Sequence, residues 1–157
     1  MTKEQVKEYT FKITQANRVE LIVIMYDIAI QYIDDAIACH KKNMTDEFRY
    51  NLKRAKNVVT ELAAALDLKY EISGELMKLY MFMNKALIQC DIRNEAEVLE
   101  RLTGMLGNLK ESFGSIKEAE SDGPVMENSQ QVYAGLTYSK NSLNEDMYVD
   151  TNRGYTV

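Results

Sequence analysis

Residues 20–33 read ELIVIMYDIAIQYI, in which Asp27 and Gln31 are the only strongly polar side chains after Glu20. A membrane-spanning helix needs about 20 nearly uninterrupted apolar residues, whereas these two residues interrupt the run and Asp34 and Asp35 end it. A secretory signal would need a basic start and a small-residue cleavage site, and the chain begins instead with the mixed-charge segment MTKEQVKEYTFK. We therefore expect a cytoplasmic protein that does not insert into a membrane.

The composition predicts a single folded domain. The 157 residues are 46% hydrophobic, which is enough for one core and hardly for two. The 19 basic and 24 acidic residues include no concentrated patch of Lys and Arg, so the sequence argues against a nucleic-acid partner. Cys39 and Cys90 lie far apart, without metal-binding or redox spacing, which favours two reduced thiols.

Apolar residues recur every three or four positions from residue 17 to residue 119, and no proline interrupts that range. This periodicity predicts successive helices. The first is expected to begin at Asn17, where Glu20 completes a capping box, and to run to about Lys42. The second is expected after Thr45, a cap candidate followed by two acidic residues. Its apolar residues form one narrow stripe: Phe48, Leu52, Ala55, Val59, Leu62 and Leu66.

The third helix is expected to start near Ser73 and to turn six side chains inward: Leu76, Leu79, Tyr80, Met83, Leu87 and Cys90. Three further apolar side chains of this helix fall outside that stripe: Met81, Phe82 and Ile88. A second capping box, Asn94 with Glu97, predicts the start of the fourth helix. We expect this helix to end before the breaker cluster SDGP at residues 121–124.

Helices of about 20 to 25 residues, joined by short linkers, place sequential helices antiparallel. The predicted fold is all-α, an antiparallel up-down four-helix bundle at residues 17–120 with an N-terminal arm at 1–16 and a C-terminal extension at 121–157. The short pattern Val6, Tyr9, Phe11 and Ile13 predicts an extended or irregular arm that lies on the bundle. The Tyr- and Asn-rich extension is typical of a disordered tail or of a peptide that docks elsewhere.

The apolar side chains of the first helix cover an arc of roughly 200° around its axis, whereas packing on one side needs an arc only slightly wider than about 100°. One explanation is that this helix is central and contacts two neighbours and the arm. The other is that surplus apolar surface on the first or third helix receives a partner helix in a groove. Met77, Met81 and Met83 on the third helix would suit an adaptable groove, although they would equally suit a core.

The sequence lacks the sets of residues on which catalysis depends. His40 is the only histidine, and a dinuclear metal site in a helical bundle needs Glu-x-x-His pairs from two helices. Its position near the end of the first helix is typical of a surface residue that interacts with the helix dipole. The seven glycines are scattered and form no phosphate-binding loop. We therefore expect no enzyme, no metal and no cofactor.

Three blocks of the predicted helices share a recognisable order and spacing: ELIVIMYDIAIQYIDDA, LKRAKNVVTELAAALD and LMKLYMFMNKALIQCDIRNE. The first contains Met25-Tyr26-Asp27, and the second follows a Lys/Arg-Ala-x-Asn-x-x-x-Glu-Leu pattern from Arg54 to Leu62. Together with Leu79-Tyr80 and Met83-Asn84 in the third block, these motifs resemble the flagellar secretion chaperone FliS family. The resemblance covers about residues 9–117.

The resemblance implies an export chaperone that binds the disordered C-terminal segment of flagellin in apolar grooves. Such a protein prevents premature polymerisation in the cytoplasm and delivers flagellin to the flagellar type III export gate. The residues expected to line the groove are Leu62, Leu66, Leu79, Tyr80, Met83, Asn84 and Leu87, with Asn84 as a polar anchor. The resemblance further implies that the arm, with Tyr9 and Ile13, covers part of the groove and docks at the export gate. The resemblance leaves open whether regulators of flagellin synthesis are also partners.

The sequence departs from the family pattern at three places: Arg18 replaces a frequent proline, Cys90-Asp91 an Ala-Asn pair, and Phe113 a frequent tryptophan. These changes bear on the shape of the groove and leave the helical framework undisturbed. The rival hypothesis is a structural bundle that homo-oligomerises through its broad apolar first helix. Asp27 is expected on the solvent-facing polar stripe of that helix.

Overall fold

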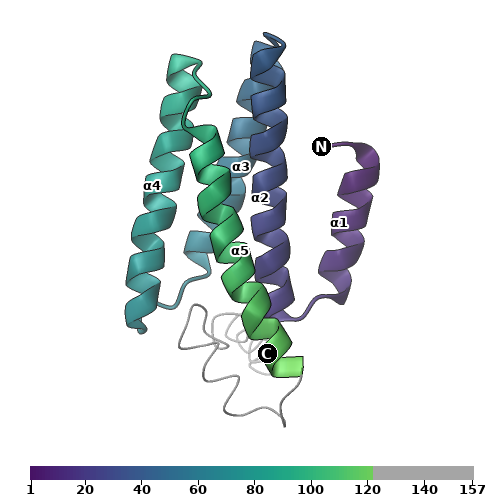
Figure 1. Ribbon diagram of the computed structural model, residues 1–157, viewed down its shortest axis with the longest axis vertical. Helices are drawn as coiled ribbons and strands as arrows, with labels where there is room; N and C mark the ends of the chain where they lie inside the picture. Colours follow the sequence, from purple (N-terminus) through teal and green to yellow (C-terminus); the bar gives the residue numbers. More distant parts are fainter. Residues whose placement is uncertain (122–157) are drawn as a thin grey trace, which may run out of the picture.

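The structure is a computed structural model that describes residues 1–121, with side chains as far as Ile116. Within these residues it contains no strand and five helices (Figure 1): α1 (Lys3–Gln15), α2 (Arg18–Lys41), α3 (Thr45–Ala64), α4 (Glu71–Arg93) and α5 (Leu99–Ser121). The prediction of an all-α fold is confirmed. The prediction for the Tyr- and Asn-rich extension concerns residues that lie outside the described part of the chain.

Helices α2 to α5 form a four-helix bundle, and the chain reverses direction from each helix to the next, as the colours in Figure 1 show. The central helix is α2, which packs against α3 and α5 and carries α1 on its outer face. On the far side of the bundle, α4 packs closely on α3 but touches α5 at only a few positions. The predicted bundle is confirmed, and α1 is a further helix beside it.

The core of the bundle explains the width of the apolar surface on α2. Four α2 side chains that lie in the core are Tyr26, Ala29, Ile33 and Ala36. The ring of Tyr26 packs against that of Phe113 on α5 with the centroids 5.5 Å apart, and its hydroxyl shares a hydrogen bond with the hydroxyl of Tyr80 on α4. Because α2 has three neighbouring helices, the explanation that it is a central framework helix is confirmed.

The predicted helix starts are correct for α2 and wrong for α3. Before α2, Asn17 Oδ1 accepts a hydrogen bond from the Glu20 amide at 2.9 Å, and Glu20 Oε2 accepts one from the Asn17 amide at 3.0 Å. Before α3, the cap position is occupied by Met44, which makes no side-chain hydrogen bond to the helix. Thr45 is instead the first helical residue, so the predicted cap at Thr45 is wrong.

The predicted capping box at Asn94 and Glu97 is also wrong, because Asn94 ends α4 and α5 begins only at Leu99. Asn94 adopts the left-handed conformation, with φ 53° and ψ 45°. Asparagine tolerates this region because its short polar side chain can bond locally, so it serves as a C-cap as well as an N-cap. The Asn94 carbonyl lies 2.9 Å from Nε2 of His40, a hydrogen bond that ties the ends of α2 and α4 together.

The prediction of an extended or irregular arm is wrong, because the arm forms helix α1. Thr2 and Gln5 form a capping box in which the Gln5 amide donates to Thr2 Oγ1 at 3.2 Å and Gln5 Oε1 accepts from the Thr2 amide at 2.7 Å. Such a box satisfies two backbone donors at the start of a helix. These local helix signals outweigh the short apolar pattern. In the helix that forms, the side chains of Val6, Phe11 and Ile13 are exposed.

Candidate functional site

The structure separates the predicted groove residues into core and surface. Five of them are at most 9% exposed and belong to the hydrophobic core: Leu62, Leu66, Tyr80, Met83 and Leu87. They pack α3 and α4 into the bundle and leave little or no side-chain surface exposed to solvent. The other two, Leu79 and Asn84, are half-buried and lie on opposite flanks of α4.

One flank of α4 faces α3 and is held there by polar contacts. Nδ2 of Asn84 donates to Oγ1 of Thr60 at 3.0 Å, and Nε of Arg49 lies 3.2 Å from Oδ1 of Asp91. The side-chain carbonyl oxygen of Asn84 is itself buried and has no hydrogen-bond partner among the described residues. Ile88 lies between these polar contacts on the same flank and is exposed.

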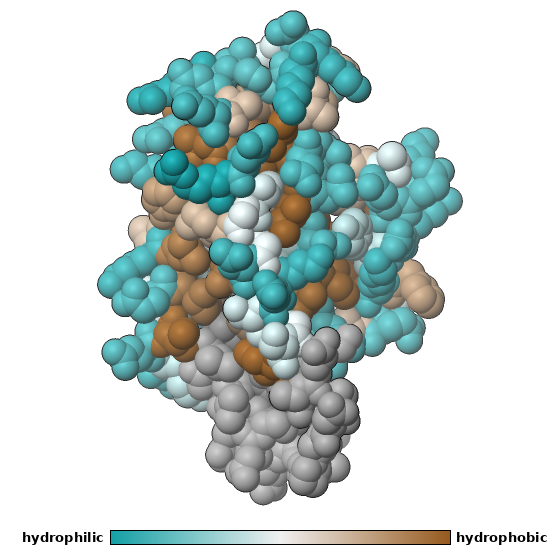
Figure 2. All heavy atoms as spheres, viewed as in Figure 1, coloured by the Kyte–Doolittle hydropathy of each residue, from teal (hydrophilic) through white to brown (hydrophobic). Residues whose placement is uncertain are grey.

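The opposite flank of α4 carries Leu79 and Phe82, which lie one helical turn apart on the side of α5. Phe82 is 47% exposed although it is a large aromatic residue. Three apolar side chains in or directly before α5 are only partly buried: Val98, which precedes the helix, and Met105 and Leu109 within it. Figure 2 shows apolar atoms gathered over α4 and α5 on this side of the molecule. We refer to these five residues as the α4–α5 face.

Asp27, the isolated carboxylate in the apolar stretch of α2, joins three helices. Its Oδ2 accepts a hydrogen bond from the Tyr9 hydroxyl of α1 at 2.8 Å, and its Oδ1 accepts one from Nζ of Lys110 of α5 at 2.5 Å. Burial alone would raise the pKa of Asp27, but the hydrogen bonds from Lys110 and Tyr9 and the charge of Lys110 outweigh it and lower the pKa. The prediction of a solvent-facing Asp27 is wrong, because both carboxylate oxygens are engaged.

The two predicted arm residues have different surroundings. Tyr9 is half-buried, and its pKa is raised first by burial and then by the hydrogen bond to Asp27, so the phenol remains a protonated donor. Nζ of Lys12 lies 5.4 Å from the centre of the Tyr9 ring. Ile13 is exposed on α1 and makes no comparable contact with the bundle. Tyr9 therefore attaches the arm, whereas Ile13 presents an apolar side chain to solvent.

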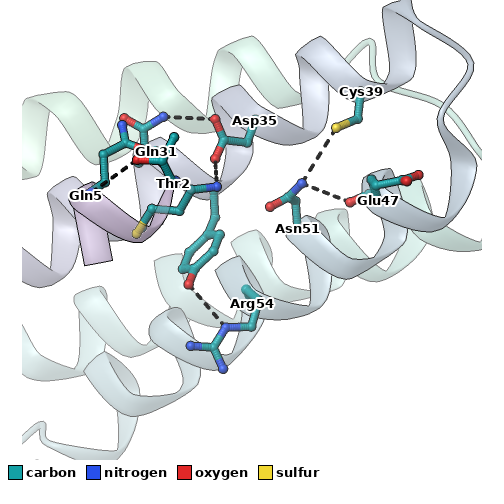
Figure 3. A network of polar contacts seen from close by, with 10 residues as sticks. Thr2, Gln5, Gln31, Asp35, Cys39, Glu47, Asn51 and Arg54 are labelled. Atoms are coloured by element: carbon teal, nitrogen blue, oxygen red, sulfur yellow. Dashed lines mark hydrogen bonds and ion pairs between the residues drawn. The ribbon is translucent and has the colours of Figure 1, made fainter. Parts of the chain in front are cut away.

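A second polar contact holds the start of α1 on α2 (Figure 3). The amino group of Met1 pairs with Asp35, whose other oxygen accepts from Nε2 of Gln31 at 3.0 Å. Three residues before Asp35 on α2, the Tyr32 hydroxyl accepts from Nε of Arg54 of α3 at 3.3 Å. Because no residue of α1 is buried, α1 is the helix that can leave the rest of the structure most readily.

Replacing Tyr9 by Phe is expected to loosen α1 while the bundle stays intact. The change removes the hydroxyl that donates to Asp27, and a hydrogen bond to a charged group contributes about 1.5–3 kcal/mol, less where solvent screens it. We expect the amides of α1 to exchange about 5-fold faster in native-state hydrogen exchange, with α2 to α5 unchanged. Tyr50→Phe on an exposed α3 tyrosine is the matched control. Unchanged exchange of α1 in Tyr9→Phe would contradict this role.

The same contact predicts how the attachment of α1 depends on pH. The pKa of Asp27 is lowered from its ordinary 3.8, so its contribution is fully present above that value and is lost as the pH falls through the lowered pKa. The pKa of Tyr9 is raised from its ordinary 10.0, so its contribution is fully present below that value and is lost only in stronger alkali. We expect protection of α1 to be constant between about pH 5 and 8 and to fall in acid. Asp27→Asn should make that fall smaller.

The described residues contain no group of three or more His, Cys, Asp or Glu side chains placed to hold a metal ion. In the same part of the chain, no helix is long and apolar enough to cross a membrane, α2 included. Cys39 and Cys90 are free thiols. Burial raises the pKa of the Cys90 thiol, which keeps it in its unreactive protonated form.

A family model described as "Flagellar protein FliS" matches residues 1–120, a range that includes α1 and nearly all of α5. The chain belongs to the FliS family. It is similar to the flagellar secretion chaperone FliS of Bacillus subtilis, 23% identical over 101 residues that cover 64% of this chain and 76% of that protein. It is also similar to the flagellar secretion chaperone FliS of Salmonella typhimurium, 34% identical over 73 residues that cover 45% of this chain and 54% of that protein.

The range of the FliS family match covers both the N-terminal helix α1 and the four-helix bundle. It begins at residue 1, so helix α1 lies inside the matched range together with the bundle. The Tyr9–Asp27–Lys110 contact therefore connects three helices of the same FliS unit. The family resemblance indicated Tyr9, but the sequence did not reveal its hydrogen bond to Asp27 or the pairing of Asp27 with Lys110. The signal that could have marked Asp27 is its isolation as a lone carboxylate in an apolar run.

Proposed function

We propose that this FliS-family chain is an export chaperone for flagellin. It binds the disordered C-terminal segment of flagellin, prevents premature polymerisation in the cytoplasm and delivers flagellin to the flagellar type III export gate. The observation that carries this proposal is the α4–α5 face, where the half-buried Leu79 and the exposed Phe82 of α4 and the partly buried Met105 and Leu109 of α5 present apolar side chains. Two relatives are named flagellar secretion chaperones.

The α4–α5 face has the properties that a disordered apolar segment requires. An amphipathic segment can lay its apolar side chains along such a face at helical spacing. Ordering a disordered segment costs about 2–5 kcal/mol, and each apolar Å² removed from water contributes about 25 cal/mol. Several adjacent contacts such as Leu79, Phe82 and Met105 are therefore needed to offset that cost. Binding then lowers the free flagellin concentration by mass action.

The arm supplies the second part of the proposed mechanism. Helix α1 covers the outer face of α2, where Ile24 and Ile28 are half-buried on the same side as Asp35. Figure 1 shows α1 across the bundle from α4, so release of α1 would expose a separate apolar strip on α2 and leave the α4–α5 face as it is. We assign Tyr9 to holding the arm until flagellin displaces it, and the exposed Ile13 to docking at the export gate.

The rival function, a structural bundle that homo-oligomerises through its broad apolar helix, has less support. That helix is α2, and its apolar surface is used within the chain by α1, α3 and α5. A second copy would have to displace one of these helices before it could contact the core-facing side chains of α2. Among the residues up to Ile116, the exposed large apolar side chains lie mainly on α1 and α4.

The deciding experiment mixes the purified full-length chain with the cognate flagellin and measures binding by calorimetry. We expect a stable complex that is lost when the C-terminal segment of flagellin is deleted, because that segment supplies the apolar contacts. In the absence of flagellin, the chain is expected to sediment as a monomer. A tight dimer, or binding that persists after the deletion, would favour the rival or place the contact elsewhere on flagellin.

A further inference from the structure

A groove lies between α3 and α4, on the flank of α4 that points away from the α4–α5 face. Its volume is about 320 Å³, and it is lined by Asp46, Arg49, Tyr50, Leu52, Lys53, Lys56, Leu87, Ile88 and Asp91. We call it the α3–α4 groove. Nothing in the proposed flagellin contact uses these residues, because the two surfaces occupy opposite flanks of α4.

The floor and rim of the α3–α4 groove are apolar. Leu52 of α3 and Leu87 of α4 are buried and form its floor. Tyr50 and Ile88 stand at the rim and are both exposed, although each is a large hydrophobic residue. An apolar side chain of a partner placed between Tyr50 and Ile88 would therefore be shielded from water on several sides, which favours binding.

The α3 wall of the groove is basic, whereas the chain as a whole has a net charge of −5. Arg49 is paired with Asp91 across the groove. Lys53 and Lys56 make no ion pair within the described residues, and Asp46, the other acidic lining residue, lies about two helical turns from Lys53. The end of the groove at Lys53 and Lys56 is therefore locally positive.

We infer that the α3–α4 groove is a docking site for an acidic amphipathic helix of a partner protein. Such a helix places apolar side chains at i, i+3 and i+4 on one face, which fits the space over Leu52 between Tyr50 and Ile88. Carboxylates on the adjoining flank of that helix meet Lys53 and Lys56. Charge complementarity selects this occupant, because a purely apolar helix would leave both ammonium groups beside it without a partner.

The test uses the full-length chain and two synthetic helical peptides of about 18 residues, long enough for roughly five turns. Both carry a row of leucines at helical spacing, and one carries glutamates along the adjoining flank where the other carries lysines. We expect the glutamate peptide to bind and to shift the NMR signals of the Ile88 methyl groups. Its affinity should fall as salt is added, and the lysine peptide should bind at least about tenfold more weakly.

The double variant Lys53→Glu/Lys56→Glu should weaken binding of the glutamate peptide by about tenfold or more, because two attractions become repulsions. Lys3→Glu/Lys7→Glu, with two exposed lysines on α1, is the matched control and should bind as the wild type does. Equal affinity for the two peptides, or unchanged binding by Lys53→Glu/Lys56→Glu, would overturn the inference. A dimer of the chain that this variant dissociates would also overturn it, since a second copy would then occupy the groove.

Discussion

Phe82→Asp is expected to weaken binding of the flagellin C-terminal segment about 30- to 150-fold while the chain remains folded. The estimate corresponds to about 2–3 kcal/mol, of which burial of the exposed half of the ring contributes about 1 kcal/mol and the introduced carboxylate the rest. Phe82 is 47% exposed on the α4–α5 face, so the aspartate can reach water in the free protein. In the complex the same carboxylate would lie against apolar side chains, which adds a desolvation cost. Calorimetry measures the affinity, and circular dichroism verifies the helix content.

The matched control for this experiment is Phe11→Asp. Phe11 is 67% exposed and lies on α1, so the substitution introduces the same charge and removes the same aromatic ring at a place away from α4. We expect Phe11→Asp to bind flagellin within about twofold of the wild type, since exposed substitutions away from a contact have small effects. Wild-type affinity in Phe82→Asp would exclude the α4–α5 face as the binding surface. Equal losses in both variants would point to the added charge itself.

The bundle could be predicted because its helices are long and strongly periodic, whereas their ends depend on contacts that the local sequence does not contain. Asn94 and Glu97 have the spacing of a capping box. The chain instead uses Asn94 as a left-handed C-cap, in a place where His40 of another helix bonds its carbonyl. Asn17 has the same local signal and caps α2 as predicted. Tertiary packing decides between the two uses of asparagine.

The candidate site was harder to predict than the fold. An apolar stripe identifies the buried side of a helix, whereas a partner contacts side chains that are exposed. Met83 and Leu87 lie on this stripe and belong to the core, whereas the family resemblance implies that they line the groove. Phe82 and Ile88 fall outside the stripe, and these are the exposed residues that a partner can contact. The contact at Asp27 could not be derived locally, because Tyr9 lies 18 residues away along the chain and Lys110 lies 83 residues away.

Met83→Ala is expected to lower the free energy of unfolding by about 2–5 kcal/mol, whereas Met81→Ala should change it by less than about 0.5 kcal/mol. The two methionines lie two residues apart on α4, but Met83 is 1% exposed and Met81 is 65% exposed. Truncating a buried methionine removes apolar contacts and leaves a cavity, whereas an exposed truncation removes little. Urea unfolding followed by circular dichroism measures both, and the midpoint should shift for Met83→Ala without a change in slope.

Flagellin binding by the same two variants distinguishes a core role for Met83 from a groove role. If Met83 only packs the bundle, the folded fraction of Met83→Ala should bind flagellin within about threefold of the wild type, since its removal leaves the α4–α5 face in place. If Met83 instead contacts flagellin after a rearrangement of α4, the loss of affinity should persist at temperatures where the variant is fully folded. A stability loss below about 1 kcal/mol in Met83→Ala would contradict its place in the core, because truncation of a buried methionine to alanine costs about 2–5 kcal/mol.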